Sequence, residues 1–330
     1  MENWVVAARR TSLTALVVLA TSFALAVLAM RQPTWPHTFA GPGGADRRRL
    51  EQHVYFLTTA VLPRNVKHQG NLDASAEYIR DEFRQDGARV SEQRFVARKQ
   101  LFRNVIAEFG PPDARQPLLI VGAHYDAFGD TGNLPGADDN ASGTAALLEI
   151  ARVLGSKRVS RPVMLVAYAN EEPPFFGSEQ MGSAVHASWL AESHRSVAGM
   201  ICLEMIGYYT AEQPWDSWLL GLMYPRRGDF IAIAGGWADR KLTRYVKMAM
   251  SSVQGSHVVS FTARRELLDA SDQRNYWSHN WTAVIVTDTA YLRNPNYHTT
   301  RDTADSLDYE RMAKVVDGCV AAILQNFSSG

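Results

Sequence analysis

The sequence has little cysteine and no excess of charge of either sign. Its two cysteines, Cys202 and Cys319, are too few for a disulfide framework. Both lie in apolar surroundings typical of buried thiols, and their spacing leaves open whether they pair. Lysine plus arginine and aspartate plus glutamate each number 34, so the formal net charge is zero. A chain without a basic excess has no field to hold a polyanion, so we expect no nucleic-acid partner.

Long uncharged apolar runs are also scarce, but one occurs near the N-terminus. Residues 11–30 follow Arg9-Arg10, carry no charge and end at Arg31. A helix of about 20 such residues spans a bilayer. We expect residues 1–31 to be an uncleaved signal anchor whose arginine pair stays cytoplasmic, so that the following chain is periplasmic or extracellular. Ala24-Leu25-Ala26 is a candidate cleavage site, and secretion after cleavage is the alternative.

The remainder of the chain is predicted to be a linker followed by one domain. Residues 32–44 contain three prolines and three glycines and predict the linker. Residues 45–330 then alternate apolar runs with amphipathic helices, which is typical of an α/β domain with a central, largely parallel twisted sheet covered by helices on both faces. The apolar runs are 118–123, 163–169, 199–203, 230–234 and 283–286, after a strand pair in 90–109; the helices are 50–62, 72–85, 142–154, 238–253 and 309–326.

Potential metal ligands follow the ends of these apolar runs. Ligands in such sheets bind beyond the carboxyl ends of the strands. His124, Glu171-Glu172 and Glu204 each come at the end of a predicted strand, and His298 lies in a polar loop before the last helix. Imidazole nitrogen and carboxylate oxygen suit Zn²⁺, and a catalytic site keeps a position open for water. The sequence therefore predicts a zinc site without cysteine.

Three further carboxylates have more than one interpretation. Asp138 and Asp139 precede a helix, where one could cap the helix and the other could bridge two metal ions. Asp126 could accept the proton on the second ring nitrogen of His124 and so fix the tautomer that binds metal.

The adjacent pair Glu171 and Glu172 predicts a division of roles. Two buried carboxylates repel each other unless a cation or a proton neutralises one of them. If one glutamate binds a metal ion and its neighbour acts as general base, the metal neutralises the first carboxylate and a proton can neutralise the second. The base would take a proton from the water that the metal activates and pass it to the leaving amine.

As a set, these motifs resemble the bacterial zinc aminopeptidase family, which also includes the glutaminyl cyclases and the glutamate carboxypeptidase type of ectoenzyme. The resemblance covers most of residues 100–325. It implies a bridging Asp139, with Glu171 as the base and Tyr297 as a residue that helps stabilise the tetrahedral intermediate. It further implies that two zinc ions are bound, one by His124 and one by Glu204. His298 would join Glu204 or the neighbouring ion, and Glu172 would bind the metal of His124 or of His298.

Two departures from the family pattern concern this site. Ser271-Asp272-Gln273 stands where the family commonly has Ser-Asp-His, which alters a contact at the edge of the pocket. Glu204 replaces the commoner aspartate, and its longer side chain could weaken or move the second metal. The expectation that two metal ions are bound is therefore weaker than the expectation that the chain is active.

The expected function is a membrane-anchored zinc exopeptidase, foremost an aminopeptidase that cleaves the first peptide bond of peptides with a free N-terminus. One alternative is a glutaminyl-peptide cyclotransferase with a single zinc, against which the full set of five ligands argues. The other is a non-catalytic binding ectodomain of the same fold, which should have lost ligands. The preferred substrate residue, and the choice between amino- and carboxypeptidase specificity, stay open.

Overall fold

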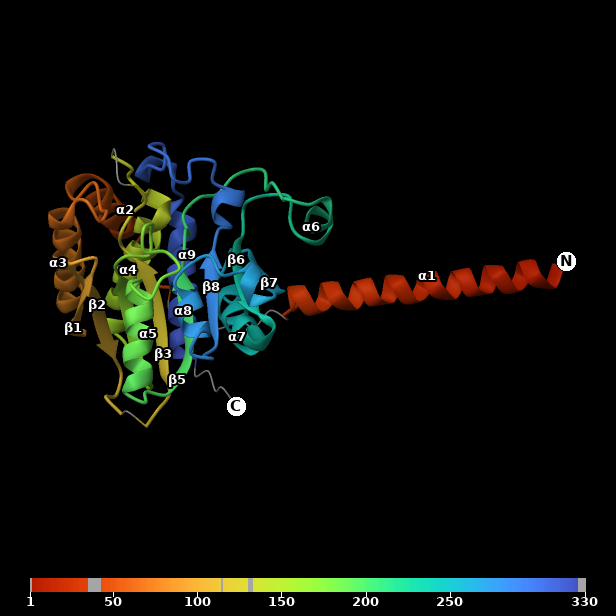
Figure 1. Ribbon diagram of the computed structural model, residues 1–330, viewed down its shortest axis with the longest axis horizontal. Helices are drawn as coiled ribbons and strands as arrows, with labels where there is room; N and C mark the ends of the chain where they lie inside the picture. The colour runs from red at the N-terminus through yellow and green to blue at the C-terminus, as the bar shows by residue number, and fades with distance from the viewer. Residues whose placement is uncertain (1, 35–42, 114, 130–132, 326–330) are drawn as a thin grey trace.

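A long N-terminal helix projects from a body of helices and strands in the computed structural model (Figure 1). The structure describes residues 2–34, 43–113, 115–129 and 133–325, with side chains from residue 14 onward. Helix α1 (Glu2–Arg31) contains the apolar segment Thr14–Arg31, which is long enough to cross a membrane. Most of the predicted linker, residues 35–42, lies outside the described part of the chain, so the predicted domain boundaries stay predictions.

The body contains an eight-stranded sheet in the order β1-β2-β4-β3-β5-β8-β6-β7. Its centre, β4-β3-β5-β8, is parallel; β1, β2 and the pair β6-β7 join it with antiparallel contacts. The predicted largely parallel sheet is thereby confirmed, with antiparallel additions on both sides. The strands are β1 (Arg89–Ala97), β2 (Gln100–Phe109), β3 (Leu118–His124), β4 (Val163–Tyr168), β5 (Val197–Leu203), β6 (Ile231–Gly236), β7 (Val258–Ala263) and β8 (Ala283–Thr287).

Helices cover both faces of this sheet because successive strand residues point to opposite faces. In β3, Leu119 and Val121 belong to the larger core, while Leu118 and Ile120 belong to the smaller one. The larger core packs against α2 (Arg47–Tyr55), α3 (Gln69–Gln85), α4 (Gly143–Gly155), α7 (Arg240–Ser251) and α9 (Tyr309–Leu324); the smaller core packs against α5 (Gly182–Glu192) and α8 (Gln273–Trp277).

Several elements depart from the expected pattern. The helix predicted for residues 50–62 is α2 continued by a π-helical turn, Phe56–Ala60. At the start of α4, Asn140 Oδ1 accepts a hydrogen bond from the Gly143 N–H (3.0 Å), while Ser142 makes no capping bond. The elements α5, α6 (Trp218–Met223), α8 and β7 were not predicted. Helix α5 is apolar around much of its circumference, so its sequence lacks the stripe that identifies a surface helix.

Candidate metal centre

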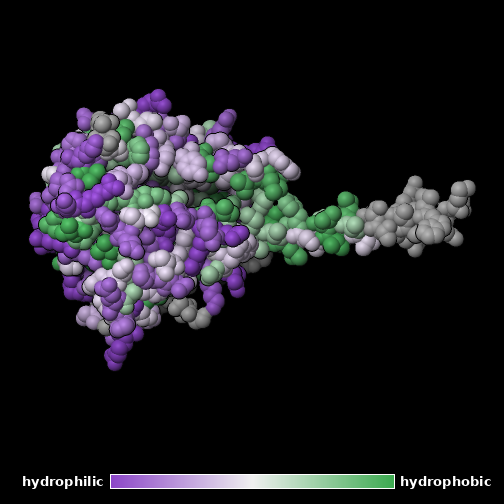
Figure 2. Space-filling model, in the orientation of Figure 1, coloured by the Kyte–Doolittle hydropathy of each residue, from purple (hydrophilic) through white to green (hydrophobic). Residues whose placement is uncertain are grey.

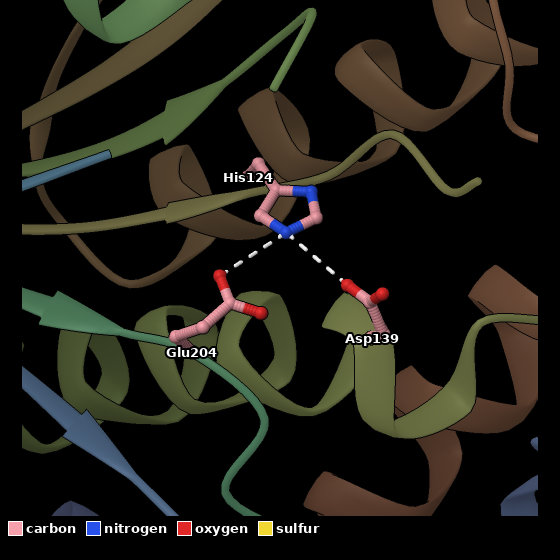
Figure 3. A group of neighbouring side chains, drawn as sticks. All are labelled: His124, Asp139 and Glu204. Carbon is pink, nitrogen blue, oxygen red and sulfur yellow. Dashed lines mark ion pairs between the residues drawn. The ribbon is translucent and has the colours of Figure 1, made fainter. Parts of the chain in front are cut away.

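Five of the predicted residues come together in two groups of three that share Asp139. In the first group, the His124 Nε2 atom lies 3.4 Å from Asp139 Oδ1 and 3.3 Å from Glu204 Oε2 (Figure 3). His124 ends β3 and Glu204 directly follows β5, while Asp139 lies in the π-helical turn Ala137–Ser142 before α4. All three side chains are buried.

The second group uses the other oxygen of Asp139. The His298 Nε2 atom lies 2.9 Å from Asp139 Oδ2 and 3.4 Å from Glu172 Oε1. The His298 ring stacks between Phe128 and Tyr297, each with its ring centroid 3.7 Å away. The His298 side chain is 21% exposed, so this group lies nearer to solvent than the first.

This arrangement selects among the ligand pairings that the resemblance had left open. The expectation that His124 and Glu204 bind separate metals differs from the structure, which places both in the first group. Glu172 lies with His298, which is one of the two partners expected for it. The reason is topological: β3 and β5 are adjacent parallel strands, so their carboxyl ends bring His124 and Glu204 to the same point.

His124 is oriented by hydrogen bonds on its ring and its backbone. Its Nδ1 atom lies 3.0 Å from the backbone carbonyl oxygen of Asp126, and Thr144 Oγ1 donates to the His124 carbonyl at 2.8 Å. The Asp126 carboxylate is 3.5 Å from Nδ1 and instead accepts the backbone N–H groups of Glu171 and Glu172, both at 3.1 Å. The predicted carboxylate contact is present at 3.5 Å but is longer than the carbonyl contact, and the Asp126 side chain also positions the glutamate pair.

Hydrogen bonds also hold the Glu204 carboxylate and the backbone of Asp139. Ser271 Oγ donates to Glu204 Oε2 at 2.6 Å, and Asn140 Nδ2 lies 3.4 Å from the same oxygen. The carboxylate of Asp302 accepts the backbone N–H of Asp139 at 3.1 Å. In Ser271-Asp272-Gln273, the motif that departs from the family pattern, Ser271 contacts the first group directly. Gln273 instead donates to the Leu268 carbonyl oxygen at 2.7 Å.

Asp138 takes a structural position beside the shared carboxylate. Its Oδ1 accepts from the Gly207 N–H and its Oδ2 from Asn294 Nδ2, both at 2.9 Å. Burial raises the pKa of Asp138 to about 6. Asp138 therefore connects the turn before α4 to two other loops, and it lies in neither ligand group.

The buried charges of the centre favour a bound cation. Burial raises the pKa values of Glu171 and Glu172 well above their usual range, and the surrounding carboxylates add to this effect. Burial lowers the pKa of His124, but the charges of Glu204 and Glu171 outweigh it and raise that pKa well above 6.5. Such a concentration of buried anionic groups is unstable unless protons or metal ions neutralise it.

Unsatisfied buried atoms point inward at the same place. Within the described part of the chain, His124 Nε2, His298 Nε2 and Glu172 Oε1 are buried without a hydrogen-bond partner. Buried polar atoms are normally satisfied, so unpartnered polar atoms of this kind indicate a missing ligand. Nitrogen and carboxylate oxygen donors from three residues in each group fit zinc with an open position. The residues present therefore fit two zinc ions.

Glu171 lies beside the ligand groups without belonging to either. Its Oε2 atom is 4.0 Å from His124 Nε2, and its backbone is fixed by Asp126. This position suits a carboxylate that exchanges a proton with a group held at the metal centre.

Arg64 is a supporting residue that sequence reasoning missed. It is fully buried and donates to the carbonyl oxygens of Tyr125 (3.0 Å), Pro135 (2.8 Å) and Gly136 (2.9 Å). These bonds join the two ends of the loop between His124 and Asp139. A lone arginine between Pro63 and Asn65 carries no sequence signal for this role.

The comparisons with known proteins identify the family of this chain. The family model of peptidase family M28 matches residues 104–323. The chain therefore belongs to peptidase family M28. This match confirms the predicted resemblance and the predicted enzyme class, a metal-dependent hydrolase of peptide bonds.

Two relatives differ in how much of their length the chain covers. The chain is 44% identical to YfbL of Escherichia coli (strain K12) over 316 residues, covering 91% of this chain and 95% of that protein. It is 26% identical over 226 residues to a probable leucine aminopeptidase 1 of Trichophyton verrucosum (strain HKI 0517), covering 64% of this chain. The chain spans only 56% of that fungal protein.

Two solved structures share the fold. BSAP, a zinc aminopeptidase from Bacillus subtilis, superposes with a TM-score of 0.68 at 16% identity, covering 86% of this chain and 95% of that one. Glutaminyl cyclase of Porphyromonas gingivalis superposes with a TM-score of 0.63 at 18% identity, covering 84% and 98%. Both likenesses confirm the predicted fold class.

Proposed function

We propose that the chain is a two-zinc aminopeptidase that α1 anchors in a membrane, with its catalytic domain on the extracytoplasmic side. His124, Asp139 and Glu204 would hold one zinc ion, and Asp139, Glu172 and His298 the other. The observation that carries this proposal is the pair of complete three-residue groups on the two oxygens of one buried carboxylate.

The chain's own residues divide the work of hydrolysis. Zinc, when bound, supplies Lewis acidity that lowers the pKa of water and polarises the substrate carbonyl. Glu171 takes a proton from the attacking water and delivers it to the leaving amine. Its position 4.0 Å from His124 Nε2 puts it beside the reaction without using it as a ligand. Tyr297, stacked on His298, would stabilise the negative charge that develops on the carbonyl oxygen.

Aminopeptidase specificity is supported by relatives rather than by a pocket in this chain. The fungal relative named above is described as a probable leucine aminopeptidase, and BSAP as a zinc aminopeptidase. Since the chain spans about half of the fungal protein and shares only the fold with BSAP, the free N-terminus of the substrate is part of the proposal.

The test combines metal analysis with a substrate panel on the purified full-length chain. We expect two zinc ions per chain and release of chromophore from aminoacyl anilides, but not from the same anilides with an acetylated amino group. Equal rates on the acetylated substrates would contradict aminopeptidase specificity.

The cyclase alternative has the P. gingivalis structure in its favour. It predicts one zinc ion and conversion of an N-terminal glutamine to pyroglutamate with loss of ammonia. Mass spectrometry of a glutaminyl peptide after incubation separates the two reactions, because hydrolysis instead releases free glutamine.

A further inference from the structure

The end of α1 is fastened to the edge strand β7. The backbone carbonyl of Arg31 accepts from Lys247 Nζ at 2.7 Å and from Ser260 Oγ at 2.6 Å. Gln32 Nε2 donates to Thr262 Oγ1 at 2.7 Å. Helix and domain therefore meet in a defined contact, so one particular side of the domain faces the membrane when α1 spans it.

A second apolar element lies on that side. Residues 210–228, here named the α6 loop, leave the domain and return to it through a bridge between Thr210 and Gly228. Its short helix α6 exposes Trp218 by 78% and Leu222 by 63%. Water-exposed side chains of this size, in adjacent turns of one helix, mark a surface that binds an apolar partner.

The α6 loop and α1 share one hydrophobic cluster. Trp215, Leu220 and Met223 of the loop pack in a cluster that also includes Val27 and Met30, which are half-buried residues of α1. The inner face of α6 thus packs in the same cluster as the end of the apolar segment, and its outer face stays uncovered by the described part of the chain.

The figures show the same continuity. The α6 loop projects on the side of the domain from which α1 leaves (Figure 1). Hydrophobic residues gather on that side and continue onto the described part of α1 (Figure 2).

We propose that the α6 loop is a second membrane contact, with Trp218 and Leu222 inserted in the interfacial layer of the bilayer that α1 crosses. A tryptophan with an apolar body and an indole N–H suits this layer. This proposal rests on the membrane-anchor part of the proposed function.

Apolar contact, not charge, drives this insertion. The exposed charged residues of the α6 loop are balanced between acidic and basic: Glu212, Asp216, Arg226 and Arg227. We therefore expect the loop to enter a bilayer of zwitterionic phosphatidylcholine without added anionic lipid.

Three leucines permit a matched test in the full-length chain. Leu222→Cys reports on the α6 loop, Leu19→Cys on the apolar part of α1, and Leu101→Cys on the far side of the domain. Leu19 and Leu101 are 69% and 53% exposed, and Leu101 lies on β2, near the opposite edge of the sheet from β7. The native Cys202 and Cys319 are buried and compete little for a polarity-sensitive fluorophore.

Each variant is labelled and reconstituted in phosphatidylcholine vesicles. We expect blue-shifted emission at positions 19 and 222 and water-like emission at 101. Lipids with a nitroxide near the headgroup should quench the label at 222 several-fold more strongly than the label at 101.

A label at 222 as water-exposed as the label at 101 would overturn the proposal while leaving the anchor intact. Water-like emission at 19 would overturn both. A blue shift at 222 that lipid nitroxides do not quench, and that grows with the protein-to-lipid ratio, would assign the surface to a second copy instead. Anilide hydrolysis by the labelled chains reports separately on the proposed enzymatic function.

Discussion

The two halves of the candidate metal centre differ in how firmly the fold holds the proposed ligands. His124 and Glu204 lie at the ends of adjacent buried strands, and Ser271 and the Asp126 carbonyl fix their side chains. His298 lies in a loop, partly exposed and held by ring stacking. Ligands fixed before metal arrives lose less conformational freedom on binding. We therefore expect the first group to bind zinc more tightly than the second.

The test with the largest expected effect separates proton transfer by Glu171 from metal binding by the two groups. Glu171→Gln removes the proposed base and leaves all five ligands in place. We expect turnover to fall by about 10³-fold, within the range for general base catalysis, with zinc content unchanged. Glu179→Gln, at an exposed position in the following loop, is the control and should keep full activity. Turnover near the wild-type rate in Glu171→Gln would remove Glu171 from the mechanism.

Because the two groups share the Asp139 carboxylate, one substitution can weaken zinc binding in both. Asp139→Asn keeps the shape of the side chain but leaves one acceptor oxygen, so a single substitution should reduce zinc affinity in both groups by about 100-fold or more. Its matched control is Asp216→Asn, an exposed aspartate of the α6 loop outside both groups. Zinc titration of the metal-depleted chains should show two weakened sites in the first variant only. Loss of a single zinc ion from Asp139→Asn would show that Asp139 does not bridge.

Each half has its own supporting residue. Ser271→Ala removes the hydrogen bond to Glu204 and should weaken the tighter zinc site by about 10-fold or more. Phe128→Leu removes one ring stacked on His298 and should weaken the other site by a smaller factor, since such stacking is worth about 1 kcal/mol. Competition with a zinc chelator measures both. The same site weakened by both variants would mean that the halves are not independent.

Sequence reasoning reached the residues of the two groups because each follows a recognisable apolar strand or motif. His124 and Glu204 come at strand ends, and the order of parallel strands brings such ends together. The division into two groups was out of reach, because it depends on which strands are neighbours in space. Asp126 shows the same limit: its distance of two residues from His124 suggested a side-chain contact, but the turn also places its carbonyl oxygen nearer to the ring, at 3.0 Å against 3.5 Å for the carboxylate.

The missed elements have local causes. Arg64 acts through carbonyl oxygens of a distant loop, and backbone acceptors leave no trace in a sequence. The strand β7 is a short edge strand with polar Ser260 and Thr262 among its apolar residues, so it lacks the continuous run that marked the central strands.

A last prediction compares His124 with a buried histidine outside the centre. His186 is fully buried, and burial lowers its pKa to about 3, while the carboxylates around His124 raise that pKa. The pKa of His186 is lower in the folded state than in the unfolded state. Between pH 3 and 6.5 the unfolded chain therefore binds more protons at this residue than the folded chain does. Stability should therefore fall as the pH drops through this window, by up to about 1.4 kcal/mol per pH unit from this residue.

The variant His186→Gln isolates this contribution. It loses the 2.6 Å contact with Tyr276 Oη and should be less stable than wild type at pH 7. Because glutamine does not titrate, the deficit should shrink as the pH falls toward 4.5. Urea unfolding of metal-depleted chains at both pH values measures the change and avoids the separate loss of zinc in acid. The exposed His194→Asn serves as the control, and a deficit in His186→Gln that stays constant with pH would show that His186 does not titrate as its burial requires.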